Sequence, residues 1–427
     1  PGRGPRSGGS AVQQSDQESH RIVVTGMGVA SAAGCSTDDL WDQLIDGKSV
    51  AAEIERVDLT GCPVRFGCEV RGFEAVSVLS AKESRRLDRT TQLTVTVADR
   101  AWADAGAPTL DPARIATVVG TGFGGLETAQ ESARDFLATA SADTKGRVHP
   151  LFIPTAMPNA GSAQIAIRGG YRGPCLTVTT ACAAGTNAIG EGARLLQQGA
   201  ADVVVTAGAE APMTAWIMSG FAAARALSER RDDPAGASRP FDADRDGFVI
   251  AEGAAALVLE RLPDARARGA HIHAELLGYG RNTDAHHLVA PPSDGAGARD
   301  CMQLALQDAG IAAADVTHVN AHGTSTEQND IAEAAALVSV FGGDPPPVTS
   351  VKGAIGHAIG AAGAIEAVVS VLTLTHGVIP PTANFATPDP AIDLDVVVEP
   401  RDLAPGAVLS NSFAFGGHNA TLVFARV

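Results

Sequence analysis

The chain has 427 residues, of which 45% are hydrophobic, 4% are aromatic and 47 are glycine. This length exceeds the size at which one hydrophobic core usually stops growing, so we expect two cores or two fused halves of a densely packed α/β protein. The formal net charge of −16 argues against general nucleic-acid binding, because that binding requires Lys and Arg to displace counterions from phosphates. An acidic partner therefore needs a local basic patch.

The cysteines and the start of the chain bear on its compartment. The six cysteines, at positions 35, 62, 68, 175, 182 and 301, show neither the paired spacing of a metal site nor a compact disulfide framework. We find no run of about 18 apolar residues and no signal peptide, so we expect a cytoplasmic protein without a metal site or a membrane span. Residues 1–20, rich in Gly, Ser and Gln, are expected to form a loose or tag-derived arm.

Strand-like runs alternate with helical stretches in the first half of the chain. The expected strands are Arg21–Thr25, Ile115–Val119, Leu176–Thr180, Asp202–Thr206 and Ala255–Leu259. Strand alternating with helix at this spacing predicts parallel sheets that are covered by helices on both faces.

The second half, from about His271, repeats this rhythm. The expected strands there are Ile272–Tyr279, Val316–Asn320, Val396–Glu399 and Thr421–Ala425, and the expected helices are Ala296–Ala309, Asp330–Val340 and His357–Thr375. The segments ACAAGTNAIGEGARLLQQGAADVVV and GHAIGAAGAIEAVVSVLTLTHGVIP both place a reactive side chain beside a small-residue helix that ends at Gly. Either this likeness is coincidence in an Ala-rich chain, or the halves are duplicates that bring Cys182 and His357 to equivalent helix starts at a shared centre.

Two motifs imitate known binding sites. GTGFGG at 120–125 follows a strand, as a dinucleotide fingerprint does, but the next stretch reads as helix and polar loop rather than a second strand ending in an acid. DADRDG at 242–247 imitates the first half of a calcium loop, but its twelfth position is Gly253, and Glu252 comes one residue early. We expect neither site, and we interpret DADRDG as a turn with salt-bridged carboxylates.

Cys182 lies in TVTTACAAGTNAIGEG, where a buried strand stops and a helix of small residues starts. A cysteine with apolar neighbours is often inert packing. A helix N-terminus, however, favours the thiolate by about 0.3 to 1 kcal/mol, and by up to about 2 kcal/mol when the group is partly buried. This effect lowers a thiol pKa of about 8.5 to roughly 7.5, which suffices for a nucleophile at neutral pH.

Two of the eleven histidines stand out because they lie in glycine-containing turns after strands. His322 lies in VNAHGTSTEQND, at the carboxyl end of a strand, where catalytic groups collect in parallel sheets. His357 lies in SVKGAIGHAIGAAGAIE, between glycines that allow close backbone approach. Either alone could be a core histidine, but with Cys182 they form a nucleophile and a polar pair. A zinc site from the same three residues lacks a fourth ligand.

At these residues the chain resembles the β-ketoacyl-[acyl carrier protein] synthases, over residues 21–427. Seven blocks occur in the family's order and at its spacing: VTGMGVAS, TACAAG, GFAAARALS, RPFDADRDGF, NAHGTSTEQND, KGAIGHAIGAAGAIE and NSFAFGGHNA. The resemblance implies the thiolase fold, an α/β fold of two pseudo-symmetric halves with mixed, mainly parallel sheets in α-β-α-β-α layers. The half with the nucleophilic Cys would be residues 21–265, and the half with the His pair would be residues 266–427.

The resemblance also implies catalytic residues, namely Cys182, His322, His357, Lys352, Glu366 and Phe415. Cys182 would accept the acyl chain, and the two histidines would serve decarboxylation and condensation. This assignment suits the chemistry, because thioester exchange needs a soft nucleophile and a malonyl-derived enolate needs two hydrogen-bond donors. Lys352 and Glu366 match a supporting ion pair, and the N–H groups of Cys182 and Phe415 match an oxyanion hole.

Further positions match the family's substrate and carrier contacts. The substrate-binding positions are Phe123, Phe221, Thr324, Thr326 and Phe413, and the carrier-binding positions are Lys82, Arg85, Arg86 and Arg225. The threonines would hold the phosphopantetheine arm, and Phe123 and Phe221 would line the acyl tunnel, where bulky Phe123 implies a short or rigid pocket. Phe413 and Phe415 resemble a gating loop hinged at glycines 416 and 417. His418 departs from the family, in which Thr is commoner.

The implied reaction is the decarboxylative Claisen condensation of a Cys-bound acyl chain with malonyl carrier protein, with no cofactor beyond the carrier's phosphopantetheine. The first interpretation is a homodimeric synthase of fatty acid elongation. The alternative is a polyketide ketosynthase in a heterodimer with a noncatalytic chain-length factor. The noncatalytic partner itself normally lacks the nucleophile, so Cys182 counts against it. A degradative thiolase needs a second cysteine near the C-terminus, and none follows Cys301, while a synthase that starts from coenzyme A esters needs Asn where His357 stands.

Overall fold

The computed structural model describes residues 20–73 and 78–427. Its main sheet has ten strands, β1 Ile22–Ala30, β4 Ile115–Gly120, β5 Cys175–Val178, β6 Val203–Glu210, β7 Gly253–Arg261, β8 Ala274–Thr283, β9 Val316–Asn320, β10 Val348–Thr349, β13 Ala407–Ala414 and β14 His418–Ala425. The spatial order is β10-β9-β13-β14-β8-β1-β7-β6-β4-β5. Of the arm expected over residues 1–20, all but His20 lies outside the described residues.

The strand directions divide this sheet into two halves of five strands. Parallel pairing joins β5, β4 and β6 at one end and β10, β9 and β13 at the other. The strands between them pair antiparallel, so the mainly parallel sheet that we expected is parallel only in these outer parts. The halves meet at β1 and β8, which pair over three residues of each strand. The sheet is therefore mixed and pseudo-symmetric, as the resemblance implied.

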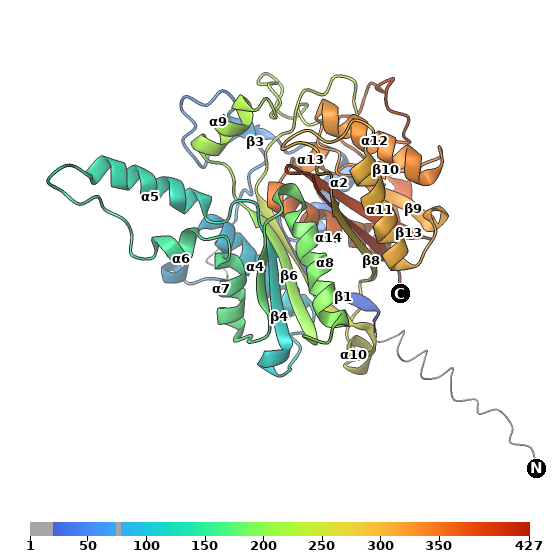
Figure 1. Ribbon diagram of the computed structural model, residues 1–427, viewed down its shortest axis with the longest axis horizontal. Helices are drawn as coiled ribbons and strands as arrows, with labels where there is room; N and C mark the ends of the chain where they lie inside the picture. Colours follow the sequence, from blue (N-terminus) through green and yellow to red (C-terminus); the bar gives the residue numbers. More distant parts are fainter. Residues whose placement is uncertain (1–19, 74–77) are drawn as a thin grey trace, which may run out of the picture.

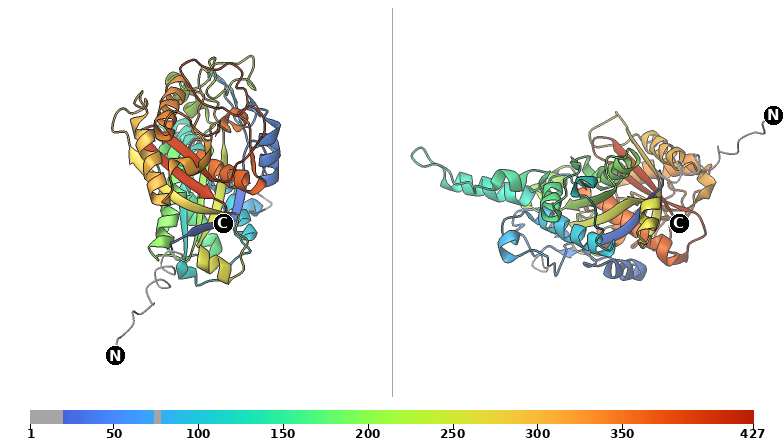
Figure 2. Two further views of the ribbon diagram at one scale, coloured as in Figure 1. Left: turned by 90° about the vertical axis from the view of Figure 1, so that its right-hand side faces the viewer. Right: turned by 90° about the horizontal axis from the view of Figure 1, so that it is seen from below.

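Helices form the remaining layers (Figure 1). They are α2 Thr37–Asp46, α3 Ala81–Ser84, α4 Arg89–Asp104, α5 Leu126–Thr139, α6 Phe152–Ala156, α7 Ala160–Gly169, α8 Ala184–Gln197, α9 Ala215–Ala223, α10 Leu262–Ala267, α11 Ala296–Ala309, α12 Glu327–Phe341, α13 Lys352–Ile355 and α14 Ala362–His376. Helices α8 and α14 contact each other and strands of both half-sheets, while α4 and α11 cover the outer faces. This is the expected α-β-α-β-α arrangement. Within the described residues, α5 and the loop after it project from the body (Figure 2).

Matching glycines in the two halves support the duplication. A Cβ on Gly26 of β1 would lie 2.2 Å from the carbonyl oxygen of Ala101 in α4. A Cβ on Gly278 of β8 would lie 2.5 Å from the carbonyl oxygen of Ala305 in α11. Any side chain at either glycine would therefore push the outer helix off its sheet. Each half places the same kind of close strand–helix contact on its first long strand.

Two sequence expectations about elements were wrong. Val396–Glu399 is not a strand, since only Val396 makes an isolated bridge to β10. The strand in this part of the chain is β13, which we did not predict. Its centre, Ser410–Ser412, is polar in sequence although it is fully buried. The expectation of no apolar run of about 18 residues was also wrong. The helical run Ile359–His376 is long and apolar enough to cross a membrane, although 89% of it is buried inside the protein.

Candidate active site

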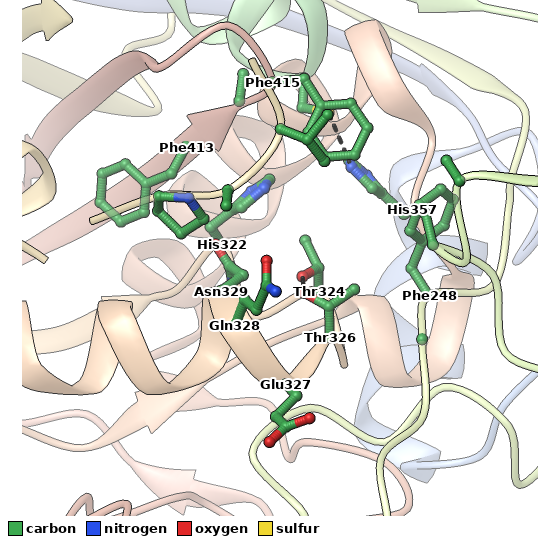
Figure 3. Close-up of a pocket in the computed structure, with 18 of the residues that line it drawn as sticks. Phe248, His322, Thr324, Thr326, Glu327, Gln328, Asn329, His357, Phe413 and Phe415 are labelled. Atoms are coloured by element: carbon green, nitrogen blue, oxygen red, sulfur yellow. Dashed lines mark hydrogen bonds between the residues drawn. The ribbon is translucent and has the colours of Figure 1, made fainter. Parts of the chain in front are cut away.

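Three turns from both halves meet at one cavity of about 510 Å³ (Figure 3). Cys182 lies in the 3-10 turn η3, Ala181–Ala183, between β5 and α8. His322 follows β9, and His357 lies between α13 and the 3-10 turn η5, Ile359–Ala361. All three side chains line the cavity, so the structure brings together the nucleophile and the histidine pair that the sequence indicated.

The turn that carries Cys182 has an unusual backbone. Ala181 has a positive φ of 48°, a conformation that is uncommon for a residue with a side chain. A hydrogen-bond chain supports this turn, because Tyr279 Oη donates to Asn187 Oδ1 at 2.6 Å and Asn187 Nδ2 donates to Thr180 Oγ1 at 2.8 Å. The second half of the chain therefore holds the nucleophile turn of the first half in place.

The Cys182 thiol is hydrogen-bonded to His357, with Sγ 3.1 Å from Nε2. Burial raises the pKa of this thiol to about 12, while Lys352 and the N–H of Phe415 act in the opposite direction. The expectation of a pKa near 7.5 was wrong, because Cys182 is only 7% exposed and desolvation outweighs the helix terminus. The thiol is protonated at rest, and His357 Nε2 is the adjacent proton acceptor.

The two imidazole rings stand almost perpendicular, with centroids 5.4 Å apart and an interplanar angle of 85°. Burial, with the charge of Lys352, holds the pKa of both His322 and His357 well below the usual value. Both rings are therefore neutral at pH 7. Lys352 Nζ lies 3.4 Å from His322 Nδ1, and because an ammonium only donates, Nδ1 accepts and the proton resides on Nε2. His322 thus offers an Nε2–H donor.

A buried ion pair lies behind His322. Lys352 Nζ donates to Glu366 Oε1 and, at 2.6 Å, to the carbonyl oxygen of His322. Lys352 and Glu366 are 1% and 2% exposed, so the sequence-predicted pair is confirmed as a contact. Burial raises the pKa of Glu366, and Lys352 counteracts that rise. The ammonium therefore fixes the turn that carries His322 as well as balancing a carboxylate.

Glu333 is a supporting residue that the sequence reading missed. Its carboxylate accepts the N–H of His322 at 2.8 Å and that of Gly323 at 2.7 Å. Its position on the apolar face of α12, three residues after buried Asp330, was the available signal. Sequence reasoning looks for side-chain chemistry, and a carboxylate that binds mainly backbone groups leaves no recognisable motif.

The loop after β13 closes the cavity on another side. Phe413 packs against His322 with ring centroids 6.1 Å apart. The backbone N–H of Phe415 donates a hydrogen bond to the Cys182 sulfur, which lowers the pKa of the thiol. Gly416 and Gly417 follow with φ of 83° and 72°, which a side chain would disfavour. His418, where the sequence departs from the family, is exposed at the start of β14.

The expected substrate residues divide into two groups. Thr324 and Thr326 line the cavity with their hydroxyl oxygens 2.8 Å apart. Phe221 also lines it, whereas Phe123 does not and contacts Phe221 from behind, with ring centroids 6.2 Å apart. Phe248, which the sequence reading missed, lies between Phe221 and His357.

The expected carrier-binding residues are placed separately. Arg225 is exposed and lines the cavity. Lys82, Arg85 and Arg86 are exposed in and just after the short helix α3, and the structure does not bring them to the cavity wall. They form a surface group apart from the reacting side chains.

The two imitation motifs have structural roles. In GTGFGG, the N–H groups of Gly122 and Phe123 bind the carboxylate of Glu210. In DADRDG, Asp242 accepts N–H groups of Ala386 and Thr387 and pairs with Arg239 at 3.2 Å. The structural turn that we expected at DADRDG is confirmed, with Asp242 as its salt-bridged carboxylate.

Comparisons with known proteins agree with this geometry. Residues 19–265 match the model of the β-ketoacyl synthase N-terminal domain, and residues 273–386 match that of the C-terminal domain. The 3-oxoacyl-[acyl-carrier-protein] synthase 2 of Synechocystis sp. is 42% identical over 414 residues, covering 96% of this chain and 99% of that protein. The synthase of the same name from Coxiella burnetii is 41% identical over 415 residues, with the same coverage.

Solved structures are similar over the same length. A β-ketoacyl synthase from Burkholderia phymatum gives a TM-score of 0.88 at 33% identity, and the ishigamide ketosynthase/chain length factor gives 0.88 at 35%. A type II PKS ketosynthase, bound to the hexaketide and in complex with its acyl-carrier protein, gives 0.86 at 31%. Each comparison covers 95% of this chain and 99% of the other.

Proposed function

Because this chain belongs to the β-ketoacyl synthase family, we propose that it is a 3-oxoacyl-[acyl-carrier-protein] synthase that condenses a Cys182-bound acyl chain with malonyl carrier protein. The observation that carries this proposal is the cavity in which the Cys182 thiol contacts His357 and faces a second neutral histidine, His322. That set combines one nucleophile with two neutral hydrogen-bond donors, as the reaction requires.

The first half-reaction loads the acyl chain. His357 Nε2 takes the thiol proton as Cys182 Sγ attacks the carbonyl carbon of the acyl thioester. The N–H groups of Cys182 and Phe415 stabilise the oxyanion of the tetrahedral intermediate. The new S–C bond stays, the bond to the carrier sulfur breaks, and the proton passes to the departing pantetheine thiol.

The second half-reaction forms the carbon–carbon bond. The bond between the malonyl Cα and its carboxylate breaks, CO₂ leaves, and the electron pair becomes an enolate. Once Sγ is acylated it no longer donates to His357, so the neutral His357 ring carries its proton on Nε2 in the acyl-enzyme. His322 Nε2–H and His357 Nε2–H then donate to the enolate oxygen. The nucleophilic carbon then attacks the acyl carbonyl carbon on Cys182, whose thiolate leaves and regains a proton. No redox partner is needed, because the electron pair released with CO₂ forms the new carbon–carbon bond, and one proton taken from solvent restores the Cys182 thiol.

The surrounding residues support these steps. Lys352, Glu366 and Glu333 hold the His322 turn, and Thr324 and Thr326 bind the phosphopantetheine arm of the incoming carrier. Phe413 and the loop through Phe415 admit the malonyl unit by moving on the glycine hinge.

Acidic carrier protein docks on local basic groups although the chain has a net charge of −16. These groups are Lys82, Arg85, Arg86 and Arg225. A carrier held there by charge would bind more weakly at high salt.

We assign the chain to fatty acid elongation as a cytoplasmic homodimer, with halves at residues 21–265 and 266–427. The 3-oxoacyl-[acyl-carrier-protein] synthases among its relatives support this pathway. The second candidate is a type II polyketide ketosynthase in a heterodimer with a chain-length factor, which the similarity to the ishigamide and hexaketide-bound assemblies supports. Purification of the chain alone, with its mass in solution, separates the two, because the second candidate requires a different partner chain.

The activity is tested with purified protein, an acyl carrier thioester and malonyl carrier protein. We expect a 3-oxoacyl carrier product and one CO₂ for each product. Omitting the malonyl carrier should leave acyl-enzyme only. Product formation without loss of CO₂, or none from any acyl length, would contradict the proposal.

A further inference from the structure

Glu210 is a fully buried carboxylate that the reaction steps above leave without a role. It ends β6 and has 0% of its surface exposed. Its four hydrogen-bond donors in the described part of the chain are all uncharged: the Thr121 hydroxyl and the N–H groups of Gly122, Phe123 and Gly360. A buried carboxylate without a cation destabilises a fold, so its presence next to the cavity calls for a function.

The donors to Glu210 come from both halves of the molecule. Gly122 N and Phe123 N, from the loop after β4, lie 2.5 and 3.1 Å from the carboxylate oxygens. Gly360 N, from turn η5 directly after His357, lies 3.1 Å from Oε2. The carboxylate therefore fastens the Phe123 loop to the turn that follows His357.

Both glycines are required by this arrangement. A Cβ on Gly122 would lie 2.8 Å from Glu210 Oε2, and a Cβ on Gly360 would lie 2.5 Å from the same atom. Real Cβ atoms do not approach so closely. The two glycines therefore let the backbone reach the carboxylate from opposite segments.

A row of packed aromatic rings, here called the ring file, connects the Phe123 loop to His357 on the cavity side. Ring centroids are 6.2 Å apart between Phe123 and Phe221, 5.3 Å between Phe221 and Phe248, and 5.3 Å between Phe248 and His357. Figure 3 shows Phe248 beside His357 at the end of the ring file. Phe123 and His357 are thus joined twice, by ring packing on one side and by Glu210 on the other.

We propose that Glu210 is a positioning residue for condensation, which locks the acyl-chain loop at Phe123 and the catalytic His357 turn into one unit. This inference rests on the proposed function, because it takes Phe221, the cavity residue that Phe123 supports from behind, as part of the acyl site and His357 as a catalytic residue. Glu210 touches neither substrate nor the reacting atoms and acts through the two backbone segments that it binds.

The same carboxylate has an electrostatic effect on the nucleophile. Its negative charge raises the pKa of the Cys182 thiol, and Lys352 opposes it, while His357 contacts the sulfur directly. Burial raises the pKa of Glu210 itself to about 7, against the hydrogen bonds that it accepts. Replacing Glu210 by a neutral isostere should therefore make the thiol easier to ionise even as positioning is lost.

Two variants separate positioning from charge. Glu210→Gln removes the charge and one acceptor oxygen. Gly122→Ala keeps the charge, and its Cβ would meet only side-chain atoms, Glu210 Oε2 at 2.8 Å and Ile359 Cγ2 at 3.3 Å, so this variant should fold. We expect condensation to fall about 10- to 100-fold in both, since displacements near 1 Å at a reacting centre cost that much.

The pH midpoint for alkylation of Cys182 by iodoacetamide, measured by mass spectrometry, reports the ionisation of the thiol. A loss of packing alone would not shift this midpoint. The alkylation midpoint should shift to lower pH in Glu210→Gln and should not in Gly122→Ala. Glu260→Gln, another buried carboxylate of the first half that is held by Arg268, serves as the matched control, with condensation and midpoint as in the wild type.

Wild-type condensation in a folded Gly122→Ala or Glu210→Gln protein would overturn the inference, as would an unchanged or raised midpoint in Glu210→Gln. Failure of the wild type to be acylated on Cys182 would instead contradict the proposed function. The alkylation comparison uses no carrier substrate and distinguishes the two failures.

Discussion

The two turns that begin α8 and α14 share one backbone design but carry different chemistry. Each starts with a residue of positive φ, Ala181 at 48° and Ile359 at 46°, followed by a 3-10 turn and a central helix of small residues. Cys182 is the middle residue of the first turn, and Gly360 is the middle residue of the second. The expectation that His357 occupies the equivalent of Cys182 was wrong, because His357 lies three residues before Gly360.

The difference shows how a duplicated scaffold divides the work. In the first half the turn faces the cavity, and the N–H of Cys182 acts on the sulfur inside that cavity. In the second half the matching N–H, that of Gly360, is already bound by the Glu210 carboxylate. The second turn therefore cannot stabilise a substrate oxyanion, and the second half contributes His322 and His357 from loops beside it. In the proposed reaction, one half holds the nucleophile and the other moves protons.

The largest effect should come from the nucleophile half. Cys182→Ala should abolish acylation and lower condensation by about 10⁴-fold or more, because the covalent step has no substitute. Peptide mapping after incubation with an acyl carrier thioester checks this, with Cys35→Ala as the matched cysteine control that is acylated normally. An acyl adduct on any other cysteine would contradict the division between halves.

The next effect concerns charge burial in the histidine half. Lys352→Ala should destabilise the protein by about 3–5 kcal/mol, because Glu366 is left as an uncompensated buried carboxylate, whereas Lys352→Met with Glu366→Leu should cost less. In the first half, Arg114→Ala breaks the exposed pair with Asp202 and should change stability by about 0–1 kcal/mol. Urea unfolding measures all three; equal losses for Lys352→Ala and Arg114→Ala would refute the prediction.

The histidines should separate the two half-reactions. His322→Ala and His357→Ala should still acylate Cys182 to some extent but lose about 10²- to 10³-fold in condensation, the usual cost of removing an oxyanion donor. Single-turnover acylation and CO₂ release from malonyl carrier protein distinguish the steps. His376→Ala, which removes a ring stacked on Trp41 away from the cavity, is the control. Full condensation in His322→Ala or His357→Ala would contradict the role assigned to that histidine.

The last predicted effect, which is spread over several pH units, is on acid stability. Burial lowers the pKa of His318, on β9, from 6.5 to about 3. Between these values the unfolded chain binds a proton that the folded chain does not, so this residue makes stability fall as the pH drops from about 6.5 towards 3. His318→Phe should reduce the slope of unfolding free energy against pH by about 1.4 kcal/mol per pH unit near pH 5. An unchanged slope would show that the buried His318 ring does not cause the fall in stability at acid pH.

The sequence predicted most of the site where side-chain type itself carries the chemistry. Cys182, His322 and His357 stood out because thiols and imidazoles in glycine-rich turns after strands are rare, and the structure places all three on one cavity. Residues that act on the backbone, such as Glu333 and Glu210, did not stand out, because an acid that binds N–H groups has no fixed spacing in the sequence.

The sequence by itself determined the family and the α/β layers, because alternating strands, small-residue helices and reactive turns are local features that survive in the order of residues. Only the tertiary structure decided the protonation states of Cys182 and the two histidines, and the different functions of the turns that begin α8 and α14. The Cys182 pKa follows from desolvation by segments far apart in the chain, which reverses the effect of the helix start. Likewise, Gly360 differs from Cys182 in function because β6 delivers a carboxylate to it from 150 residues away, and no local pattern encodes that distance.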